Sequence, residues 1–245
     1  MKYERSGPRH FFRLTLLNML LDFFPKGGKA LDAGCGDGSF SLLLAKKGLD
    51  VYALDSSKNW CESAKRKINS LNLGKRIKII CTTLEIANFD ANFYDVIFSG
   101  EVLEHINNDN DILNLFYQWL KPSGKLIISV PMIAKKFDIY DTMVGHLRLY
   151  EYSSLKKLME DIGYKITKTM SWGFPFTKWY HKYIFLKWAA KFNNENEIDN
   201  SRNLTKRIGM NSILSVLLSL PFFIDLLLTK PNRAIGIMLK ATKQR

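Results

Sequence analysis

The most constraining feature of this chain is a glycine-rich turn between an apolar run and a helical pattern. Residues 31–45 read LDAGCGDGSFSLLLA, with glycines at the alternate positions 34, 36 and 38. Glycine has no Cβ atom, so the backbone can turn tightly there and approach a ligand closely. A following helix points its free amide groups and the positive end of its dipole at that ligand. The pattern therefore predicts a strand, a ligand-binding turn and a helix.

Two acidic residues indicate which ligand the turn accepts. Asp32 lies inside the turn, where it would repel a pyrophosphate but suits a cationic amino group. Asp55 ends the apolar run at 51–54, where a carboxylate can hold two ribose hydroxyls. The glycine spacing is G-x-G-x-G, whereas dinucleotide folds use G-x-G-x-x-G. An amino group and a ribose without a phosphate predict S-adenosylmethionine.

Short β-like runs alternate with helical patterns along the chain, which favours a mostly parallel sheet. With 245 residues and 47% hydrophobic content, the chain can bury a substantial core, and we expect one domain over residues 1–245. Strands are expected at 29–33, 51–55, 77–81, 95–99, 125–130, 164–171 and 234–241. Helices are expected near 9–24, 38–47, 57–71, 109–120 and 153–162.

The C-terminal third has a different character. Residues 174–192 contain eight aromatic side chains, some at helical spacing, which is more typical of a core face than of a ligand pocket. A polar, mobile loop is expected at 193–203. The apolar run 213–228 is shorter than the roughly 20 residues of a membrane span. Residues 174–230 are therefore expected to form a helical, aromatic-rich insert that serves as a lid or a membrane-contacting lobe.

The charge is strongly positive, at +13 overall, and residues 174–245 hold 12 Lys and Arg against 4 Asp and Glu. This surplus points to an anionic partner, either a lipid surface or nucleic acid, with a merely solvated basic surface as the alternative. The three cysteines show no disulfide or zinc spacing, and the first residues lack a signal-peptide core. We expect a cytoplasmic protein, and no carboxylate–histidine spacing indicates a metal.

Four segments resemble motifs of the class I S-adenosylmethionine-dependent methyltransferases, in particular the type 11/12 group. Residues 31–38 resemble the first motif, 94–106 the fourth-strand motif, and 120–126 the connection into the fifth strand. The segment GHLRLY at 145–150 resembles one found in a branch of that family. The resemblance implies a Rossmann-like seven-stranded sheet in the order 3-2-1-4-5-7-6. Its last strand is expected to be antiparallel, with flanking helices and a helical insert before that strand.

The resemblance also implies S-adenosylmethionine as the cofactor, bound at the carboxyl ends of the first strands. Asp32 and the glycine loop would lie beside the methionine part, and Asp55 would take the ribose hydroxyls. Thr83 and Leu84 would flank the adenine, while Ser99 would line the floor beside the reactive methyl group. The implied cofactor-binding residues are Asp32, Gly34, Cys35, Gly36, Gly38, Asp55, Ser56, Thr83, Leu84 and Ser99.

The sulfonium methyl group is already electrophilic, so positioning supplies much of the acceleration. A hydroxyl or acidic C–H acceptor also needs a base, and His146 is the first candidate for it, with Glu101 as the second. A loop-anchoring hydrogen bond is the alternative role for His146. Glu104 is better explained as a charge at a helix start, and His105 as a structural histidine.

The expected function is methyl transfer to an oxygen, nitrogen or carbon atom of a small or lipid-linked acceptor. An RNA methyltransferase and a non-enzymatic cofactor-binding assembly partner are the alternatives. Nucleic acid is disfavoured because SGEV, at 99–102, stands where a base-flipping N/D-P-P-Y tetrapeptide would follow the fourth strand. The two apolar segments and the basic surplus favour peripheral contact with an anionic inner-membrane surface. The competing explanation is that the two segments cover the sheet, or each other in a homodimer, and that the lysines are merely solvated.

Overall fold

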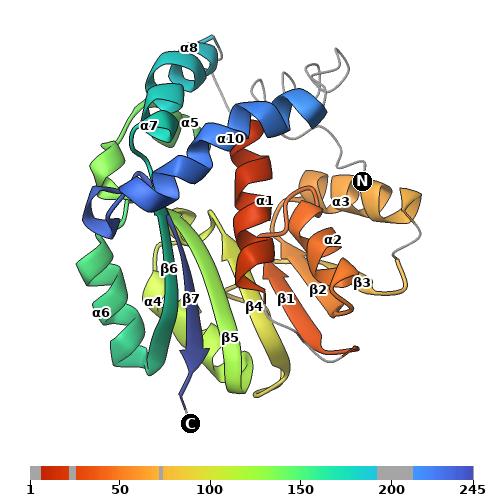
Figure 1. Cartoon of the computed structure of the whole chain (residues 1–245). Helices are drawn as coiled ribbons and strands as arrows, with labels where there is room; N and C mark the ends of the chain where they lie inside the picture. Colours follow the sequence, from red (N-terminus) through yellow and green to blue (C-terminus); the bar gives the residue numbers. More distant parts are fainter. Residues whose placement is uncertain (1–6, 22–25, 72–73, 192–211, 245) are drawn as a thin grey trace.

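A computed structural model of the chain describes residues 7–21, 26–71, 74–191 and 212–244. A central sheet runs through the molecule with helices on both sides (Figure 1). Its seven strands follow the order β3-β2-β1-β4-β5-β7-β6, and β7 is antiparallel to both of its neighbours. The predicted strand order and the antiparallel last strand are therefore confirmed. The strands are β1 (Lys29–Ala33), β2 (Asp50–Asp55), β3 (Ile77–Cys81), β4 (Tyr94–Gly100), β5 (Leu120–Pro131), β6 (Tyr164–Trp172) and β7 (Gly236–Lys243).

The central strands are apolar on both faces because helices cover both faces of the sheet. On one face pack α1 (Pro8–Leu20), α2 (Ser39–Lys46) and α3 (Lys58–Ser70). On the other face pack α4 (Asp109–Trp119) and α6 (Tyr152–Ile162). All five helices lie within one or two residues of their predicted positions, apart from the end of α1.

The strand β5 begins five residues earlier than expected. Helix α4 ends at Trp119 and β5 starts at the next residue, so the segment KPSG at 121–124 lies within the strand. A register shift between Tyr94 and Val96 of β4 accommodates the early pairing. Ser123 adopts a φ of +65°, a left-handed conformation that costs less for glycine than for serine. Pairing with β4 therefore extends the strand through residues 120–126, the segment that resembles the family's connection into the fifth strand.

The parallel strands β1, β2, β4 and β5 all end at one edge of the sheet, the upper edge in Figure 1. Several short elements gather there, among them η1 (Leu103–His105), η2 (Ile133–Lys135) and α5 (Ile139–Val144). Open α/β sheets bind their ligands at this edge. The loops that carry the predicted site residues are therefore brought together there.

The segment after β6 forms α7 (Phe176–Tyr180), the π-helical turn η3 (His181–Phe185), α8 (Leu186–Ala189) and α10 (Ser212–Leu228). The aromatic side chains at helical spacing in 176–190 were expected to face the core. This prediction is wrong, because Trp179 and Tyr183 are 56% and 46% exposed. Thr177, His181 and Phe185 are the buried residues instead. The sheet face beneath is already filled by α1 and α10, so polar anchors rather than the aromatic rings select which side of α7 faces inward.

Asp225 is the first of these anchors. It is fully buried in α10, and its two carboxylate oxygens accept hydrogen bonds from the backbone amides of Phe176 (3.0 Å) and Thr177 (2.7 Å). These amides belong to the first turn of α7, which has no partners of its own for them. The residue that interrupts the apolar run 213–228 thus caps another helix, and α10 continues through both Pro221 and Asp225.

None of the helices in the described part of the chain is both long and apolar enough to cross a bilayer. The polar segment 193–203, for which a mobile loop is expected, lies outside the described residues.

Candidate active site

The glycine turn is fastened to β2 by backbone hydrogen bonds. The amides of Gly34 and Cys35 both donate to the Leu54 carbonyl at 2.8 Å. The amide of Gly36 donates to one carboxylate oxygen of Asp55 (2.8 Å), and the amide of Ser57 donates to the other (2.9 Å). Asp55 is therefore held rigidly, while each of its oxygens keeps a lone pair for a ligand hydroxyl.

The surroundings of the glycines in this turn differ, so a side chain would be tolerated differently at each position. Gly34, Gly36 and Gly38 all adopt positive φ angles, of 78°, 51° and 76°. A Cβ atom at Gly34 would lie 2.2 Å from a methyl carbon of Val102, so packing excludes a side chain there. A Cβ atom at Gly36 would meet no heavy atom within 4 Å. The turn is thus open beside the Asp55 carboxylate, which fits a ligand that lies against the Gly36 backbone.

Asp32 is completely buried at the end of β1. One of its oxygens accepts a hydrogen bond from the Ser41 hydroxyl, and the other has no partner among the described residues. Burial, reinforced by the nearby charge of Asp55, raises the pKa of Asp32 to about 7. A cationic ligand group at the turn would supply the missing counter-charge.

Cys35 is also buried, and burial raises the pKa of its thiol, which keeps the group protonated and inert.

Two further polar residues of this region were not singled out from the sequence. Asp37 accepts hydrogen bonds from the amide and hydroxyl of Ser39 and forms an ion pair with Lys67 at 2.9 Å. Burial would raise the pKa of Asp37, but Lys67 outweighs it and the pKa lies well below its usual range. Ser57 accepts from the Trp60 amide as the N-cap of α3. The acidic residue directly before a helix and the Ser-x-x-Trp start of α3 are capping signals that sequence reasoning could have used.

The remaining predicted cofactor residues lie around this turn. Ser56 is exposed immediately after Asp55, and Thr83 is exposed in the loop after β3. Leu84 is 4% exposed and packs in the core on the α4 side of the sheet. Ser99 is buried beside β1, and its hydroxyl has no partner within the described ranges. Their contacts with a cofactor remain predictions.

Glu101 follows β4 with a φ of +58°. Its carboxylate pairs with Arg13 of α1 at 2.7 Å and accepts a hydrogen bond from the Ser129 hydroxyl at 3.0 Å. Burial would raise the pKa of Glu101, but the guanidinium groups of Arg13 and Arg9 lower it. A paired carboxylate with a lowered pKa is a weak base, so this geometry favours anchoring over proton transfer.

His146 follows α5, and Asp141 of that helix orients it. The Nδ1–H of His146 donates to Asp141 at 2.7 Å, and the His146 backbone amide donates to the Asp141 carbonyl at 2.9 Å. Asp141 itself is fixed by Lys135 and by a capping box with Asp138. The imidazole therefore presents its Nε2 atom, which lies 3.8 Å from an oxygen of Glu104. His146 is thus positioned as the candidate base, with an anchoring hydrogen bond on the opposite nitrogen.

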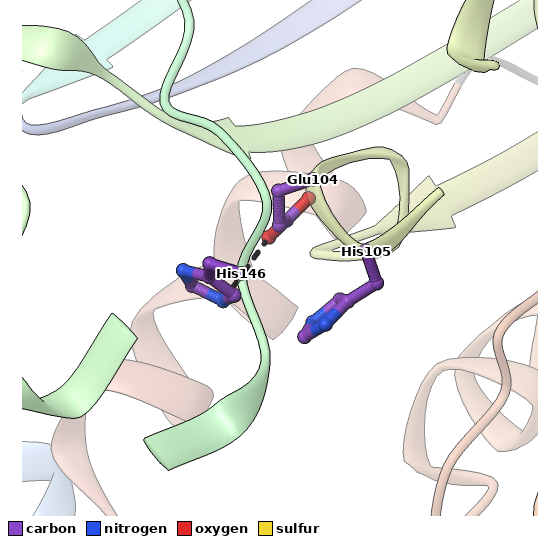
Figure 2. Close-up of side chains that lie close together, drawn as sticks. All are labelled: Glu104, His105 and His146. Atoms are coloured by element: carbon purple, nitrogen blue, oxygen red, sulfur yellow. Dashed lines mark ion pairs between the residues drawn. The ribbon is translucent and has the colours of Figure 1, made fainter. Parts of the chain in front are cut away.

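Glu104 differs from the expectation of a charge at a helix start, because it is completely buried in η1. Its backbone carbonyl accepts from the Leu147 amide at 2.8 Å, which ties η1 to the segment after α5. The neighbouring His105 donates Nδ1–H to the Gly145 carbonyl at 3.2 Å, as expected of a structural histidine. Figure 2 shows Glu104 and His146 pointing toward one another, with the His105 ring beside them. Spacing alone did not reveal this group, since the tertiary fold joins segments about 40 residues apart.

Comparison with known proteins agrees with this architecture. Residues 31–128 match a family described as a methyltransferase domain. Phosphoethanolamine N-methyltransferase 1 of Arabidopsis thaliana is 28% identical over 176 residues, covering 67% of this chain and 35% of that protein. Ubiquinone biosynthesis O-methyltransferase of Coxiella burnetii is 36% identical over 121 residues, covering 49% of this chain and 50% of that protein. The chain thus spans half or less of the length of these two relatives.

The solved structure of Haemonchus contortus phosphoethanolamine N-methyltransferase 2 in complex with S-adenosyl-L-methionine is similar with a TM-score of 0.63. The two sequences are 20% identical, and the match covers 94% of this chain and 52% of that one, which shows a shared fold. The family match, the relatives and the strand order agree with one another. They identify a class I S-adenosylmethionine-dependent methyltransferase domain in this chain.

Proposed function

We propose that this protein transfers a methyl group from S-adenosylmethionine to an oxygen, nitrogen or carbon atom of a lipid-linked acceptor. The observation that carries the methyl-transfer part is the open turn at Gly36 beside the rigidly held Asp55. When bound, S-adenosylmethionine supplies an electrophilic methyl group, whose bond to sulfur breaks as the bond to the acceptor atom forms. Asp55 would hold the ribose hydroxyls, and Asp32 would face the cationic amino group.

His146 is the group best placed to take a proton from the acceptor. Asp141 accepts its Nδ1–H, so the other ring nitrogen carries the lone pair. That nitrogen faces the Glu104 carboxylate of η1, near the ends of β4 and β5. An acceptor hydroxyl would give its proton to Nε2 as its oxygen attacks, and the Asp141 carboxylate would stabilise the resulting imidazolium.

An exposed apolar surface near the same edge of the sheet supports a lipid-linked acceptor. Lys178, Lys182 and Lys187 are exposed on the same helical segment, so apolar and cationic side chains occur together. This combination is typical of segments that lie in the interface of an anionic membrane. The exposed apolar side chains are Phe174, Phe176, Trp179, Tyr183, Ile184, Leu217, Leu218, Leu220, Ile224, Leu227 and Leu228.

The names of the two relatives differ in the acceptor. One is a phosphoethanolamine N-methyltransferase, and the other is an O-methyltransferase of ubiquinone biosynthesis. A small phosphorylated amine would not require an exposed apolar surface, whereas a prenylated or acylated acceptor would. We therefore infer peripheral contact of α7, η3 and α10 with the inner face of a membrane. Burial of α10 in a homodimer is the alternative use of this surface, and sedimentation velocity distinguishes the two.

The test combines cofactor binding with a choice of acceptors. Calorimetry should detect one S-adenosylmethionine per chain, and labelled methyl groups should appear in a lipid extract rather than in phosphoethanolamine. The double variant Trp179→Ser/Leu220→Ser should lose co-sedimentation with anionic vesicles. Ile86→Ser is the matched control, because Ile86 is 74% exposed on a different loop. If the protein methylates phosphoethanolamine and does not bind vesicles, the proposal of a lipid-linked acceptor is overturned, while that of methyl transfer stands.

A further inference from the structure

Glu104 is an unusual carboxylate because it is buried without a hydrogen bond from any described residue, and the ion pair drawn in Figure 2 reaches His146 only across 3.8 Å. Its side chain is completely inaccessible to solvent, and neither oxygen makes a hydrogen bond within the described residues. The nearest basic atom is Nε2 of His146, at 3.8 Å, which is beyond hydrogen-bonding distance. Burying an unpaired charge costs far more free energy than burying a paired one. The site therefore lacks a positive charge that would balance Glu104.

The basic residues close to Glu104 are already used. Arg13 pairs with Glu101, and Lys135 pairs with both Asp138 and Asp141. Neither of these two described residues is therefore free to supply the missing counter-charge.

Two histidines complete the group, and each already uses its Nδ1 atom in a hydrogen bond. A carbonyl and a carboxylate only accept hydrogen bonds, so the Nδ1 atoms of His105 and His146 must donate to Gly145 and Asp141. Each neutral ring then has its lone pair on Nε2. Metal-binding histidines show this arrangement, in which a carbonyl or carboxylate fixes the tautomer from behind.

The distances are close to those of a coordination site. One ligand atom from each of Glu104, His105 and His146 lies within 4.8 Å of the other two. Ligands at about 2.0–2.1 Å from a tetrahedral ion stand roughly 3.4 Å apart. The 3.8 Å between His146 and Glu104 is near this value, so small rotations of the side chains would close the site around an ion.

We propose that Glu104, His105 and His146 bind one divalent transition-metal ion of the zinc type. Two imidazoles and one carboxylate suit Zn²⁺ better than Mg²⁺ or Ca²⁺, which prefer oxygen ligands. Three protein ligands leave a coordination position open, as in catalytic zinc sites. If the proposed methyl transfer holds, an acceptor hydroxyl in that position would ionise more easily. The ion would then replace His146 as the group that promotes proton loss.

Metal binding can be tested without any methyl acceptor. The full chain is stripped with a chelator, dialysed, and titrated with Zn²⁺ by calorimetry and with Co²⁺ by visible absorption. We expect one equivalent per chain, with Co²⁺ bands typical of nitrogen and oxygen ligands. Glu104→Gln should weaken Zn²⁺ binding by more than about 100-fold. Asp141→Asn removes the carboxylate behind His146 together with its ion pair to Lys135, and it should weaken Zn²⁺ binding by about 10–100-fold.

Two controls keep the result interpretable. Cys81→Ser removes an exposed thiol that could bind Zn²⁺ elsewhere, and it should leave the affinity and stoichiometry unchanged. Circular dichroism of Glu104→Gln, a substitution of equal size that removes a buried charge, should show a folded protein. Absence of Zn²⁺ and Co²⁺ binding by the wild type, or equal binding by Glu104→Gln, would overturn the proposal. Neither outcome bears on S-adenosylmethionine binding, which is measured separately.

Discussion

The two sides of the candidate active site differ in how their carboxylates are satisfied. On the cofactor side, Asp55 accepts two backbone amides and Asp37 is paired with Lys67. On the proposed acceptor side, Glu104 is buried and makes no side-chain hydrogen bond to any residue that the structure describes. The cofactor turn is therefore preorganised by its own backbone, whereas the proposed acceptor side contains a buried carboxylate for which we propose a metal ion as the balancing charge.

The difference follows from where the residues lie along the chain. The cofactor turn is built by β1, β2 and the starts of the helices that follow them, between residues 32 and 67. The acceptor side joins η1 to the segment after α5, and the contact between Leu147 and Glu104 holds them together. A local motif can bind the same cofactor in many proteins of one fold, whereas the loops that meet over long range can differ with the acceptor.

The largest effect is expected from His146→Ala, which should change the methyl-transfer rate but not cofactor affinity. His146→Ala should lower the methyl-transfer rate by about 10²–10⁴-fold while S-adenosylmethionine affinity changes by less than about threefold. The reason is that His146 faces Glu104 rather than the glycine turn. Single-turnover rates with an identified acceptor, together with calorimetric affinity, provide the measurement. A rate loss below threefold would give His146 a purely structural role.

Within the cofactor turn, Gly34 and Gly36 should respond differently to the same substitution. Gly34→Ala should lower the free energy of unfolding by about 2–4 kcal/mol, from the left-handed φ and the clash with Val102. Gly36→Ala has no such clash, so it should cost only about 1 kcal/mol of stability but weaken cofactor binding. Urea unfolding and calorimetry separate these effects. Equal losses of stability would show that Val102 yields easily.

Asp55→Ala should weaken S-adenosylmethionine binding by more than about tenfold. Loss of charge-assisted hydrogen bonds to two ribose hydroxyls costs roughly 1.5–3 kcal/mol. The acceptor side should be unaffected, so Zn²⁺ affinity serves as the control measurement. Unchanged cofactor affinity in Asp55→Ala would remove this residue from the site.

The pH dependence of stability should have opposite signs at Asp32 and Asp37. The folded-state pKa of Asp32 is raised to about 7, so between pH 4 and 7 the folded protein holds a proton that the unfolded chain has lost. Stability therefore falls as pH rises through this window. Asp32→Asn should accordingly raise the free energy of unfolding of the cofactor-free protein by about 2–4 kcal/mol at pH 8, and by little at pH 4.

Asp37→Asn is the matched control for that experiment. Its folded-state pKa is lowered through Lys67, so its contribution is present above the ordinary carboxyl pKa and is lost as pH falls. Asp37→Asn should therefore destabilise the protein at pH 8. Thermal unfolding of both variants across pH 4–8 provides the measurement, and shifts of the same sign would contradict the assigned environments.

Much of the fold could be predicted because its signals are local. Buried parallel strands are apolar on both faces, and the turn after β1 needs glycines whatever surrounds it. The side of α7 that faces inward could not be predicted in this way. Helical spacing favoured Phe176, Trp179 and Tyr183. The His181 ring instead forms a hydrogen bond with Asp138, and the side that carries Thr177, His181 and Phe185 is buried.

The sequence by itself determined the sheet, its strand order through the family resemblance, and the cofactor turn with Asp32 and Asp55. The strands and the turn depend on short segments close together in the chain, because glycine and the alternation of strand and helix restrict the local backbone geometry. The tertiary structure alone decided that Glu104 is buried without a hydrogen bond from the described residues and that His146 lies opposite it. Burial and electrostatic balance depend on which distant segments meet, and no spacing along the chain encodes that.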